Sequence, residues 1–286
     1  MASLKYQVAL ARFPGRKAVS YNAFSVELRV GRQGAPTIFR GAQRTSLCAM
    51  FAFEDLRCVH LELMDRNLTL NEVKGLQFEH RVIPGFELDL SLSEDTIFGQ
   101  MSSACRRCVR KAEKSGVFIE ESHHDAFADD YYGQLQDVFA KQSLVPPYGI
   151  DRVRELIRHI DPTGMLLLLR ARDSSGRCIG TGIFPAFNQT MYFWGGASWR
   201  QDQPLRPNEL IQWYAMKYWK QRGIVRYDMG GGGEYKRKYG GTDIAVPWFR
   251  KSKYRTISDL RNLALRMFKA RQFLLAKWQK SPVAGN

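Results

Sequence analysis

The residues best suited to chemistry lie in one stretch, residues 227–241, which reads YDMGGGGEYKRKYGG. Six glycines and three tyrosines accompany three consecutive cations at residues 236–238. Glycine-rich backbone can approach a ligand closely or adopt positive φ, and an ammonium group held out of water can stabilise a developing oxyanion. We expect Tyr235 and Tyr239 to anchor a short helical turn from which Lys236 points inward. The alternative, that the cations form a solvated surface, stays open at this point.

Other arrangements of reactive residues are less complete. No GK[ST] follows the four glycines, so a Walker A loop is excluded, and neither G-x-G-x-x-G nor a G-x-S-x-G elbow is present. Cys105 and Cys108 form a single C-x-x-C on an expected helix, without a second pair, which is better explained by packing than by zinc or redox chemistry. His123 and His124, near three aspartates, match no standard metal-ligand spacing. We therefore expect no metal site.

Composition indicates a protein with a sizeable core. The chain has 286 residues, of which 44% are hydrophobic, enough for one large domain or two modest ones. The longest purely apolar run, MLLLL at 165–169, is far shorter than a membrane span, and the N-terminus lacks the apolar stretch of a secretory signal. Five cysteines, an odd number, favour a reducing compartment over a disulfide framework. We expect a soluble, cytoplasmic protein.

Charge is the strongest bulk signal. The chain has 43 basic and 28 acidic residues, for a formal net charge of +15. Such a balance favours nucleic acid, an anionic membrane surface or a phosphate-rich substrate as partner. From Arg250 to the end there are ten Lys or Arg residues and a single acid, Asp259. Leu260, Leu263 and Leu265 belong to a near-helical apolar pattern in this segment. We expect a C-terminal helix docked on the core, with contact to a polyanion or anionic lipid as the alternative.

Residues 1–92 are predicted to form short strands without a strong helix. Five segments are rich in β-branched and aromatic residues and are separated by Gly, Pro and Asn. Their sequences are QVALARF, AFSVELRV, LCAMFAF, VHLELM and FELDLSL.

The pattern becomes helical at Ser93. Residues 93–116 begin with Ser and two acids and end with Lys-Ser-Gly, which are the signals of a helix start and a helix end. Apolar residues recur inside this segment at three- and four-residue spacing, which places its arginines and lysines mostly on the other faces. We expect one basic helix here, then a short strand (VFIEE) and two helices over about 125–142 and 151–160.

Residues 165–229 show the clearest pattern. MLLLLRA, CIGTGIFPAF and TMYFWGGAS, joined by the turns DSSG and NQ, predict a three-stranded meander. The helix PNELIQWYAMKYWKQRG follows, starting at Pro207 and ending at Gly223, and then the strand IVRYDM. This order predicts a mixed α/β sheet with a crossover helix. Ligands in such sheets bind beyond the strand ends, and the four glycines leave a strand end.

Together these segments resemble the Fem-type branch of the GNAT acyltransferase superfamily. The resemblance covers about residues 85–250 and rests on RRCVRKAEKSGV, YFWGGAS, PNELIQWYAMKYWKQRG and YDMGGGGEYKRKYGG. That branch includes peptidoglycan-bridge aminoacyltransferases and cellulose-biosynthesis-type acetyltransferase domains. The resemblance implies an α/β (α+β) GNAT fold, with a mixed central sheet and helices on both faces, and acyl transfer to an amine or hydroxyl. We expect a strand-rich region at 1–92, in the place of a reduced GNAT-like copy, a GNAT-like domain at 93–250, and a basic helix at 251–286.

The resemblance also implies roles for individual residues. Lys236 matches a lysine implicated in steadying the acyl-transfer intermediate, and Asp228, Gly230 and Gly240 match positions that shape the loop. Apart from the resemblance, Asp228 is a candidate proton acceptor, with a buried structural hydrogen bond as the alternative, and it completes the catalytic candidates. The candidate substrate-binding residues are Gly230, Gly231, Gly232, Tyr235, Tyr239, Gly240, Trp194, Arg200, Arg206 and Asn208. The candidate polyanion-binding residues are Arg106, Arg110, Lys111, Arg237 and Lys238; the first three match a basic helix of the family, and in this sequence they are equally compatible with surface charges.

Two departures from the family pattern affect the expected function. The region before Ser93 is shorter than the first of the two GNAT-like domains of bridge-forming enzymes. The acetyl-CoA loop [QR]-x-x-G-x-[GA] is absent, and the corresponding place reads SWRQDQPLRPNEL. A helix N-terminus with Arg200 and Arg206 nearby can still receive an anion.

We therefore expect an acyltransferase whose donor is a co-substrate, with no tightly bound cofactor. The missing loop and the net charge of +15 favour aminoacyl-tRNA as donor, with a small-molecule or cell-wall-type precursor amine as acceptor. The alternatives are an acyl-CoA-dependent N- or O-acyltransferase in polysaccharide or secondary-metabolite biosynthesis, and a non-catalytic basic module that binds RNA or a membrane. With aminoacyl-tRNA as donor, we also expect peripheral membrane contact through the basic C-terminal helix.

Overall fold

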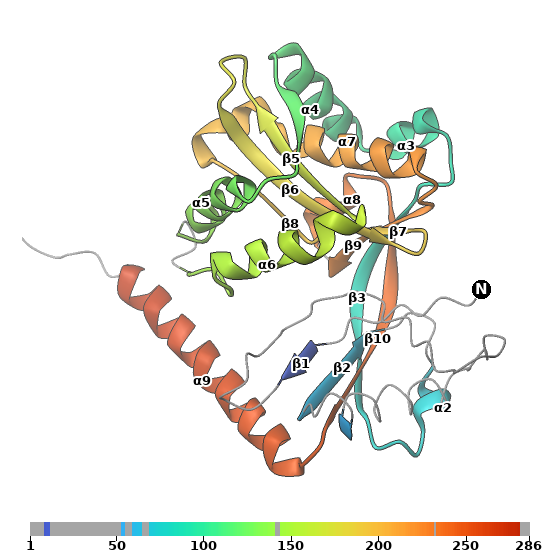
Figure 1. Cartoon of the computed structure of the whole chain (residues 1–286), viewed down its shortest axis with the longest axis vertical. Coiled ribbons are helices and arrows are strands. Elements are labelled where there is room, and N and C mark those ends of the chain that lie inside the picture. Colours follow the sequence, from blue (N-terminus) through green and yellow to red (C-terminus); the bar gives the residue numbers. More distant parts are fainter. Residues whose placement is uncertain are drawn as a thin grey trace, which may run out of the picture. The chain divides into compact units, whose positions relative to one another are not determined.

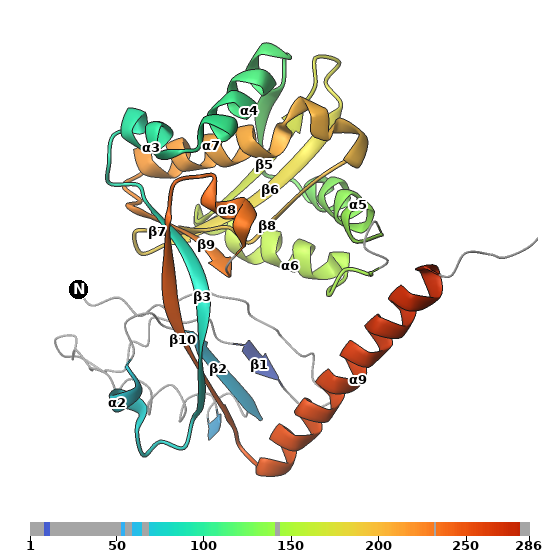
Figure 2. The same ribbon diagram turned by 180° about the vertical axis from the view of Figure 1, so that it is seen from behind.

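A computed structural model describes residues 9–11, 53–54, 59–64, 69–140, 144–231 and 233–280 (Figures 1 and 2). The chain divides into two compact units: unit 1 contains residues 1–84 and 245–270, and unit 2 contains residues 85–244 and 271–286. This division differs from the predicted boundaries at Ser93 and Arg250. The reason is that two long strands, β3 (Glu79–Asp89) and β10 (Thr242–Ser252), each contribute residues to both units.

Unit 2 is built on a mixed sheet. Its strands are the second half of β3, β4 (Phe118–Ser122), β5 (Leu166–Arg172), β6 (Cys178–Phe187), β7 (Thr190–Tyr192), β8 (Gly195–Ser198) and β9 (Arg226–Gly231). Their order is β3-β9-β7-β6-β5-β4, with β8 also bonded to β6. β7 and β9 are parallel, and the other pairs in this unit are antiparallel. The predicted mixed sheet is confirmed.

Helices cover both faces of this sheet (Figure 1). One core contains residues of α3 (Glu94–Gln100), α4 (Ser103–Lys114) and α7 (Pro207–Gln221). The other contains residues of α5 (Ala126–Ala140) and α6 (Ile150–Ile160), which is followed by a 3-10 turn, η2 (Asp161–Thr163). The predicted helices at 125–142, 151–160 and 207–223 are thus confirmed.

Two glycines in β6 let α7 pack directly on the sheet. A Cβ built on Gly180 would lie 3.0 Å from Pro207 Cβ, and one on Gly182 would lie 2.7 Å from Ile211 Cγ2. A side chain at Gly182 would require a neighbouring group to move, and one at Gly180 would be tightly crowded by Pro207. The CIGTG segment therefore sets how closely α7, which carries the start of the candidate site, approaches the strands.

The single helix predicted over 93–116 is wrong, because the segment forms two helices. Met101 is extended (φ −62°, ψ 146°), and Ser102 starts α4 by accepting a hydrogen bond from Cys105 N at 3.2 Å. Arg106 Nη1 donates to the carbonyl oxygens of Gly99, at 2.6 Å, and Met101. Both Ser93 and Ser102 are helix caps, and the apolar spacing continues across the break, so periodicity alone hid it.

The predicted strand TMYFWGGAS is also divided in two. β7 ends at Tyr192 and β8 begins at Gly195. Phe193 N still bonds to Asp228 O of β9, at 2.9 Å, whereas Trp194 N bonds back to Ile183 O of β6, at 3.1 Å. This change of partner at Phe193 and Trp194 is the most consequential local feature of the sheet.

Unit 1 contains β1 (Ala9–Ala11), β2 (His60–Met64) and part of β10, paired antiparallel in the order β1-β2-β10. A four-residue helix, α2 (Leu70–Val73), precedes β3. β1 lies inside the predicted strand QVALARF, β2 inside VHLELM, and the end of β3 inside FELDLSL. The predicted strand AFSVELRV, and LCAMFAF apart from its last residue, lie outside the described residues.

The predicted C-terminal helix is present as α9 (Arg255–Lys280). Of its predicted apolar residues, Leu260, Leu263 and Leu265 are 67%, 54% and 42% exposed, so these three are not docked as expected. The side chains of the other four, Phe268, Phe273, Leu274 and Trp278, lie outside the described part of the structure. The less exposed face carries Ile257 and Arg261 instead. None of the described helices is both long and apolar enough to cross a membrane.

Candidate active site

The candidate site is centred on the end of β9. Gly230 has φ +75°, which L side chains rarely adopt, and its N–H donates to Asp228 Oδ1 at 2.7 Å. Because the chain turns at Gly230, the carbonyl oxygens of Met229 and Gly231 converge on one point. Gly230, at the end of β9, therefore provides a backbone conformation that other residues rarely adopt.

That point is occupied by the side chain of Lys236. Lys236 Nζ donates to Met229 O at 2.6 Å and also to Gly231 O. The residue is 7% exposed, so the expectation that Lys236 points inward is confirmed. Burial lowers the pKa of Lys236, and the negative charge of Asp228 opposes that shift. An ammonium group has three donors, so the two carbonyl bonds leave one N–H for another acceptor.

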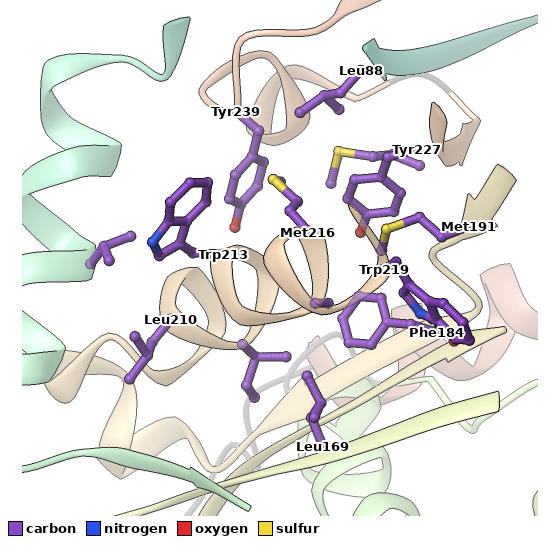
Figure 3. Packing of buried hydrophobic residues seen from close by; sticks show 14 of the residues in the cluster. Leu88, Leu169, Phe184, Met191, Leu210, Trp213, Met216, Trp219, Tyr227 and Tyr239 are labelled. Atoms are coloured by element: carbon purple, nitrogen blue, oxygen red, sulfur yellow. Dashed lines mark hydrogen bonds between the residues drawn. The ribbon is translucent and has the colours of Figure 1, made fainter. Parts of the chain in front are cut away.

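A one-turn helix, α8 (Glu234–Arg237), presents this lysine. Tyr239 is 3% exposed and points toward α7, as Figure 3 shows together with Tyr227. Tyr239 therefore anchors the turn, as expected, but it belongs to the core and is not placed to contact a substrate. Tyr235 is 55% exposed, and its ring lies 5.6 Å from Lys236 Nζ, so the expectation that it anchors the turn is wrong.

The end of the turn is fixed by close backbone contacts. Gly240 has φ +85°, and a Cβ there would lie 2.5 Å from Gln100 O. A Cβ on Gly241 would lie 2.5 Å from Glu87 O. These two glycines are required by the approach of neighbouring main chain. Gly232 lies outside the described residues, and Gly233 is extended (φ 173°).

The neighbouring cations of the triplet have partners of their own. Lys238 Nζ donates to Glu209 Oε1 of α7 at 2.7 Å, and Arg237 pairs with Asp243 at 2.6 Å and with Glu234 at 3.3 Å. Glu209 is 7% exposed. Glu209 could not be singled out from the sequence, because its one signal is an acid in the first turn of a helix, which is common on grounds of the helix dipole alone.

Two strands part beside Lys236, and we call this place the strand fork. β7 and β9 run parallel through the pairs Met191–Tyr227 and Tyr192–Asp228. Beyond Phe193 and Asp228, β8 pairs with β6, whereas β9 pairs with β3 at Gly231. Among the described residues, no strand pairing or main-chain hydrogen bond joins the two arms beyond this point. Lys236 is held by the β9 arm of this fork.

Trp194 lies on the other arm. Its ring packs 5.3 Å from the ring of Tyr148 and 6.1 Å from that of Tyr131. The hydroxyl groups of Tyr131 and Tyr148 are 2.8 Å apart, and a Cβ on Gly195 would lie 2.3 Å from Tyr131 Oη. Because Gly195 has no side chain, the hydroxyl of Tyr131 can lie close to the backbone of β8. Trp194 is half-buried among aromatic rings at the position where the fork opens.

The residues before α7 form a separate group. A 3-10 helix, η3 (Arg200–Leu205), is tied down by Asp202, whose two carboxylate oxygens accept from Arg177 at 2.7 and 2.8 Å. Arg200 and Arg206 are exposed, and Arg206 has φ +62°. Asn208 donates to Ser198 Oγ of β8, at 3.0 Å, so its side chain joins α7 to the fork.

The basic residues of α4 are not gathered at the lysine. Arg106 caps the end of α3 as described above, and the guanidinium of Arg110 lies 5.4 Å from the centre of the Phe98 ring. Lys111 is exposed. Among the candidate polyanion-binding residues, Arg106 and Lys238 are thus engaged with protein groups, whereas Arg110 and Lys111 are presented to solvent.

The cysteine and histidine motifs have structural explanations. Cys105 is buried in the core beside α7, and burial raises the pKa of its thiol to about 12, which makes a thiolate ligand or nucleophile unfavourable. His123 contacts Asp161 at 3.2 Å. Among the described residues, no three His, Cys, Asp or Glu side chains are grouped so that they could hold a metal ion.

The sequence of residues 100–239 matches the family of acetyltransferase (GNAT) domains. This segment contains the fork, α7 and the Lys236 turn, and the fold agrees with the match. The match to a GNAT domain is thus confined to residues 100–239, and the expected GNAT fold is confirmed. None of the curated proteins compared with the chain matches it significantly in sequence.

At low sequence identity, the chain is similar to several solved structures. The crystal structure of FemX is similar with a TM-score of 0.64 and 13% identity, over 76% of this chain and 77% of that chain. L-PGS from Bacillus licheniformis matches with a TM-score of 0.49 and 9% identity, over 71% of each chain. A GCN5-related N-acetyltransferase from Sphaerobacter thermophilus matches with a TM-score of 0.40 and 14% identity, over 68% of this chain and 59% of that chain.

Proposed function

We propose that the chain is an acyltransferase that moves an aminoacyl group from aminoacyl-tRNA to the amine of a small-molecule or cell-wall-type precursor. The observation that carries the proposal is the buried ammonium of Lys236, held by two carbonyl oxygens where β8 and β9 part. A cation fixed in this way is prepared for a charge that appears only during the reaction, which is the arrangement that accelerates acyl transfer.

In the proposed reaction, the acceptor amine attacks the acyl carbon of the donor ester, and the carbonyl oxygen becomes an oxyanion. The remaining N–H of Lys236 donates to that oxyanion. Collapse of the tetrahedral intermediate breaks the ester bond, and the ribose oxygen leaves with a proton. The amine loses a proton to a base, for which Asp228 is the candidate. Because Asp228 Oδ1 also accepts from Gly230 N, this residue shapes the turn whether or not it takes the proton. No step requires a tightly bound cofactor or metal.

The start of α7 supports tRNA over CoA as the donor. In this chain the first turn of α7 carries Pro207, which has no N–H, and the buried carboxylate of Glu209. A pyrophosphate placed there would meet one donor fewer and an acidic group that already complements the helix dipole. The net charge of +15 and the exposed Arg110 and Lys111 suit a large polyanion. The likeness in fold to FemX agrees with the Fem-type resemblance of the motifs.

Acyl-CoA is the second candidate donor, because the matched family is that of acetyltransferase domains and because Arg200 and Arg206 are exposed beside α7. The two donors are separated by incubating the protein with a pool of charged tRNAs and with a pool of CoA thioesters, and measuring which is consumed with formation of an acylated product. A Lys236→Met variant in parallel identifies turnover that depends on the site. Consumption of CoA esters alone would overturn the choice of donor.

The same experiment tests the non-catalytic alternative. α9 exposes both leucines and cations, so contact between this helix and anionic lipid remains part of the proposal. The protein would instead be a non-catalytic basic binding module if it bound tRNA or anionic vesicles but transferred no acyl group from either pool to any amine.

A further inference from the structure

We infer that the ion pair between Glu209 and Lys238 is a positioning device for Lys236, an inference that rests on the proposed function. Lys238 follows Lys236 by two residues, and its Nζ lies 2.7 Å from Glu209 Oε1 on α7. Glu209 is the third residue of α7, and its side chain is 9% exposed, while the side chain of Lys238 is 32% exposed. The pair thus joins the catalytic turn to the crossover helix of the domain.

Lys238 is held at both of its ends. While its ammonium bonds to Glu209, its carbonyl oxygen accepts from Ser102 N at the start of α4, at 2.9 Å. The next residue, Tyr239, is buried, and Gly240 lies against the main chain of Gln100. One residue therefore connects the turn to α4 and to α7, and both helices belong to the same core.

The turn needs such anchors because it is too short to be stable without tertiary contacts. α8 has four residues, and a helix of that length is not stable without tertiary contacts. Its first residues give little support, since the side chain of Glu234 is 91% exposed and Tyr235 is 55% exposed. The position of Lys236 therefore depends on its two carbonyl partners and on the far end of the turn, where Lys238 and Tyr239 are fixed.

A buried carboxylate is a costly way to gain stability, since desolvation offsets much of the attraction between the charges. It does impose geometry, because the pair is satisfied only when the two groups are correctly placed. The Glu209–Lys238 pair therefore serves mainly to fix the position of the turn, and it adds little to the stability of the whole domain. In catalysis, displacement of a reacting group by about 1 Å can cost on the order of 10²-fold in rate.

The test measures the environment of Lys236 directly. Wild-type protein and a Glu209→Gln variant are treated with a short pulse of N-hydroxysuccinimidyl acetate at mildly alkaline pH, and acetylation of each lysine is quantified by peptide mass spectrometry. Exposed Lys114 is the internal reference. In the wild type Lys236 is protected by its two carbonyl partners. Loss of the anchor opens the turn, and the acetylation of Lys236 relative to Lys114 is expected to rise by about tenfold.

Two further variants keep the inference falsifiable. Lys238→Met removes the other charge and is expected to give the same rise. Asp243→Asn is the matched control: it removes the exposed ion pair of Arg237 in the same turn and is expected to leave Lys236 protected. Thermal unfolding identifies variants that are globally unstable. Unchanged protection of Lys236 in both Glu209→Gln and Lys238→Met would overturn the inference.

Kinetics then separate this inference from the proposed function. With the donor consumed by the wild type, Glu209→Gln is expected to lower kcat by about 10²-fold with KM nearly unchanged. If Lys236→Met transfers normally while Glu209→Gln still deprotects Lys236, the proposed function fails and the positioning device stands. If Lys236→Met is inactive and Glu209→Gln is fully active, the positioning device fails and the proposed function stands.

Discussion

The Lys236 turn and helix α4 carry similar sequence signals with different outcomes. Each has several cations within a few residues, at 236–238 in the turn and at Arg106, Arg107, Arg110 and Lys111 in α4. In the turn, Lys236 is 7% exposed and bonded to two carbonyl oxygens. In α4, Arg107, Arg110 and Lys111 are exposed, and Arg106 caps the preceding helix.

The difference lies in the backbone that surrounds the charges. In the turn, Gly230 at positive φ directs two carbonyl oxygens to one place, and Gly240 admits the neighbouring main chain. In α4 the carbonyl groups are used within the helix. Its cations face solvent, the end of α3 or, for Arg110, the ring of Phe98. The charged triplet forms a candidate site because the glycine conformation leaves main-chain carbonyl oxygens available to accept hydrogen bonds from one of its cations, Lys236.

The largest effect on this contrast is expected from Gly240→Ala. The substituted residue would have to adopt φ +85° with its Cβ 2.5 Å from Gln100 O. We expect destabilisation on the order of 3 kcal/mol, measured by chemical denaturation, together with loss of transfer activity. Gly223→Ala is the matched control, because it has φ +81° with no atom within 4 Å of the added Cβ. Its cost should be only about 1 kcal/mol, and equal costs for both would show that the close approach at Gly240 is unimportant.

The pH dependence of transfer is the next largest effect. Stabilisation of an oxyanion requires protonated Lys236, and burial puts the pKa of Lys236 below its ordinary value of 10.5. The rate should therefore fall as pH rises through that lowered pKa, by about tenfold per unit beyond it. Because the charge of Asp228 opposes the shift, Asp228→Asn should move this falling limb to lower pH. Hydrolysis of the donor without protein is subtracted. A rate that rises steadily to pH values above 10.5 would contradict the role of the ammonium form.

The smallest effects are expected in α4, where substitution of Arg106 should affect stability more than substitution of Arg110. Arg106→Gln removes the donor to Gly99 O and Met101 O and should cost about 1 kcal/mol of folding stability. The double change Arg110→Gln and Lys111→Gln should alter stability by no more than about 0.5 kcal/mol. If these residues bind phosphates, it should also reduce the salt dependence of tRNA affinity by about two counterions. An unchanged salt slope would leave Arg110 and Lys111 as plain surface charges.

Much of unit 2 could be predicted from the sequence because its signals are local. The helices at 125–142 and 207–223 were indicated by apolar spacing and by their flanking residues. The inward direction of Lys236 was indicated by the glycines before it and by the spacing of Tyr235 and Tyr239, although Tyr235 does not anchor the turn. The break at Met101 was missed because Ser102, a second helix start, lies inside a continuing apolar period. The docking of Leu260 and Leu263 was wrong, since the apolar pattern of a helix does not state whether anything packs against it.

The partners of the site could not be predicted in the same way. Glu209 and Lys238 are 29 residues apart in sequence, and Ser102 and Lys238 lie still further apart, so only the packing of α4, α7 and the turn brings them together. The strand fork depends on Trp194 returning to Ile183 while Phe193 stays with Asp228. No local propensity distinguishes those two neighbours.

The central claim is that the buried ammonium of Lys236 stabilises the transition state of acyl transfer. The most direct test is the single-turnover transfer rate of Lys236→Met, measured with the donor that the wild type consumes, with thermal unfolding recorded on the same preparation. The account predicts a rate lower by about 10²- to 10³-fold in a protein that remains folded. A folded Lys236→Met protein that transfers the acyl group at the wild-type rate would contradict it.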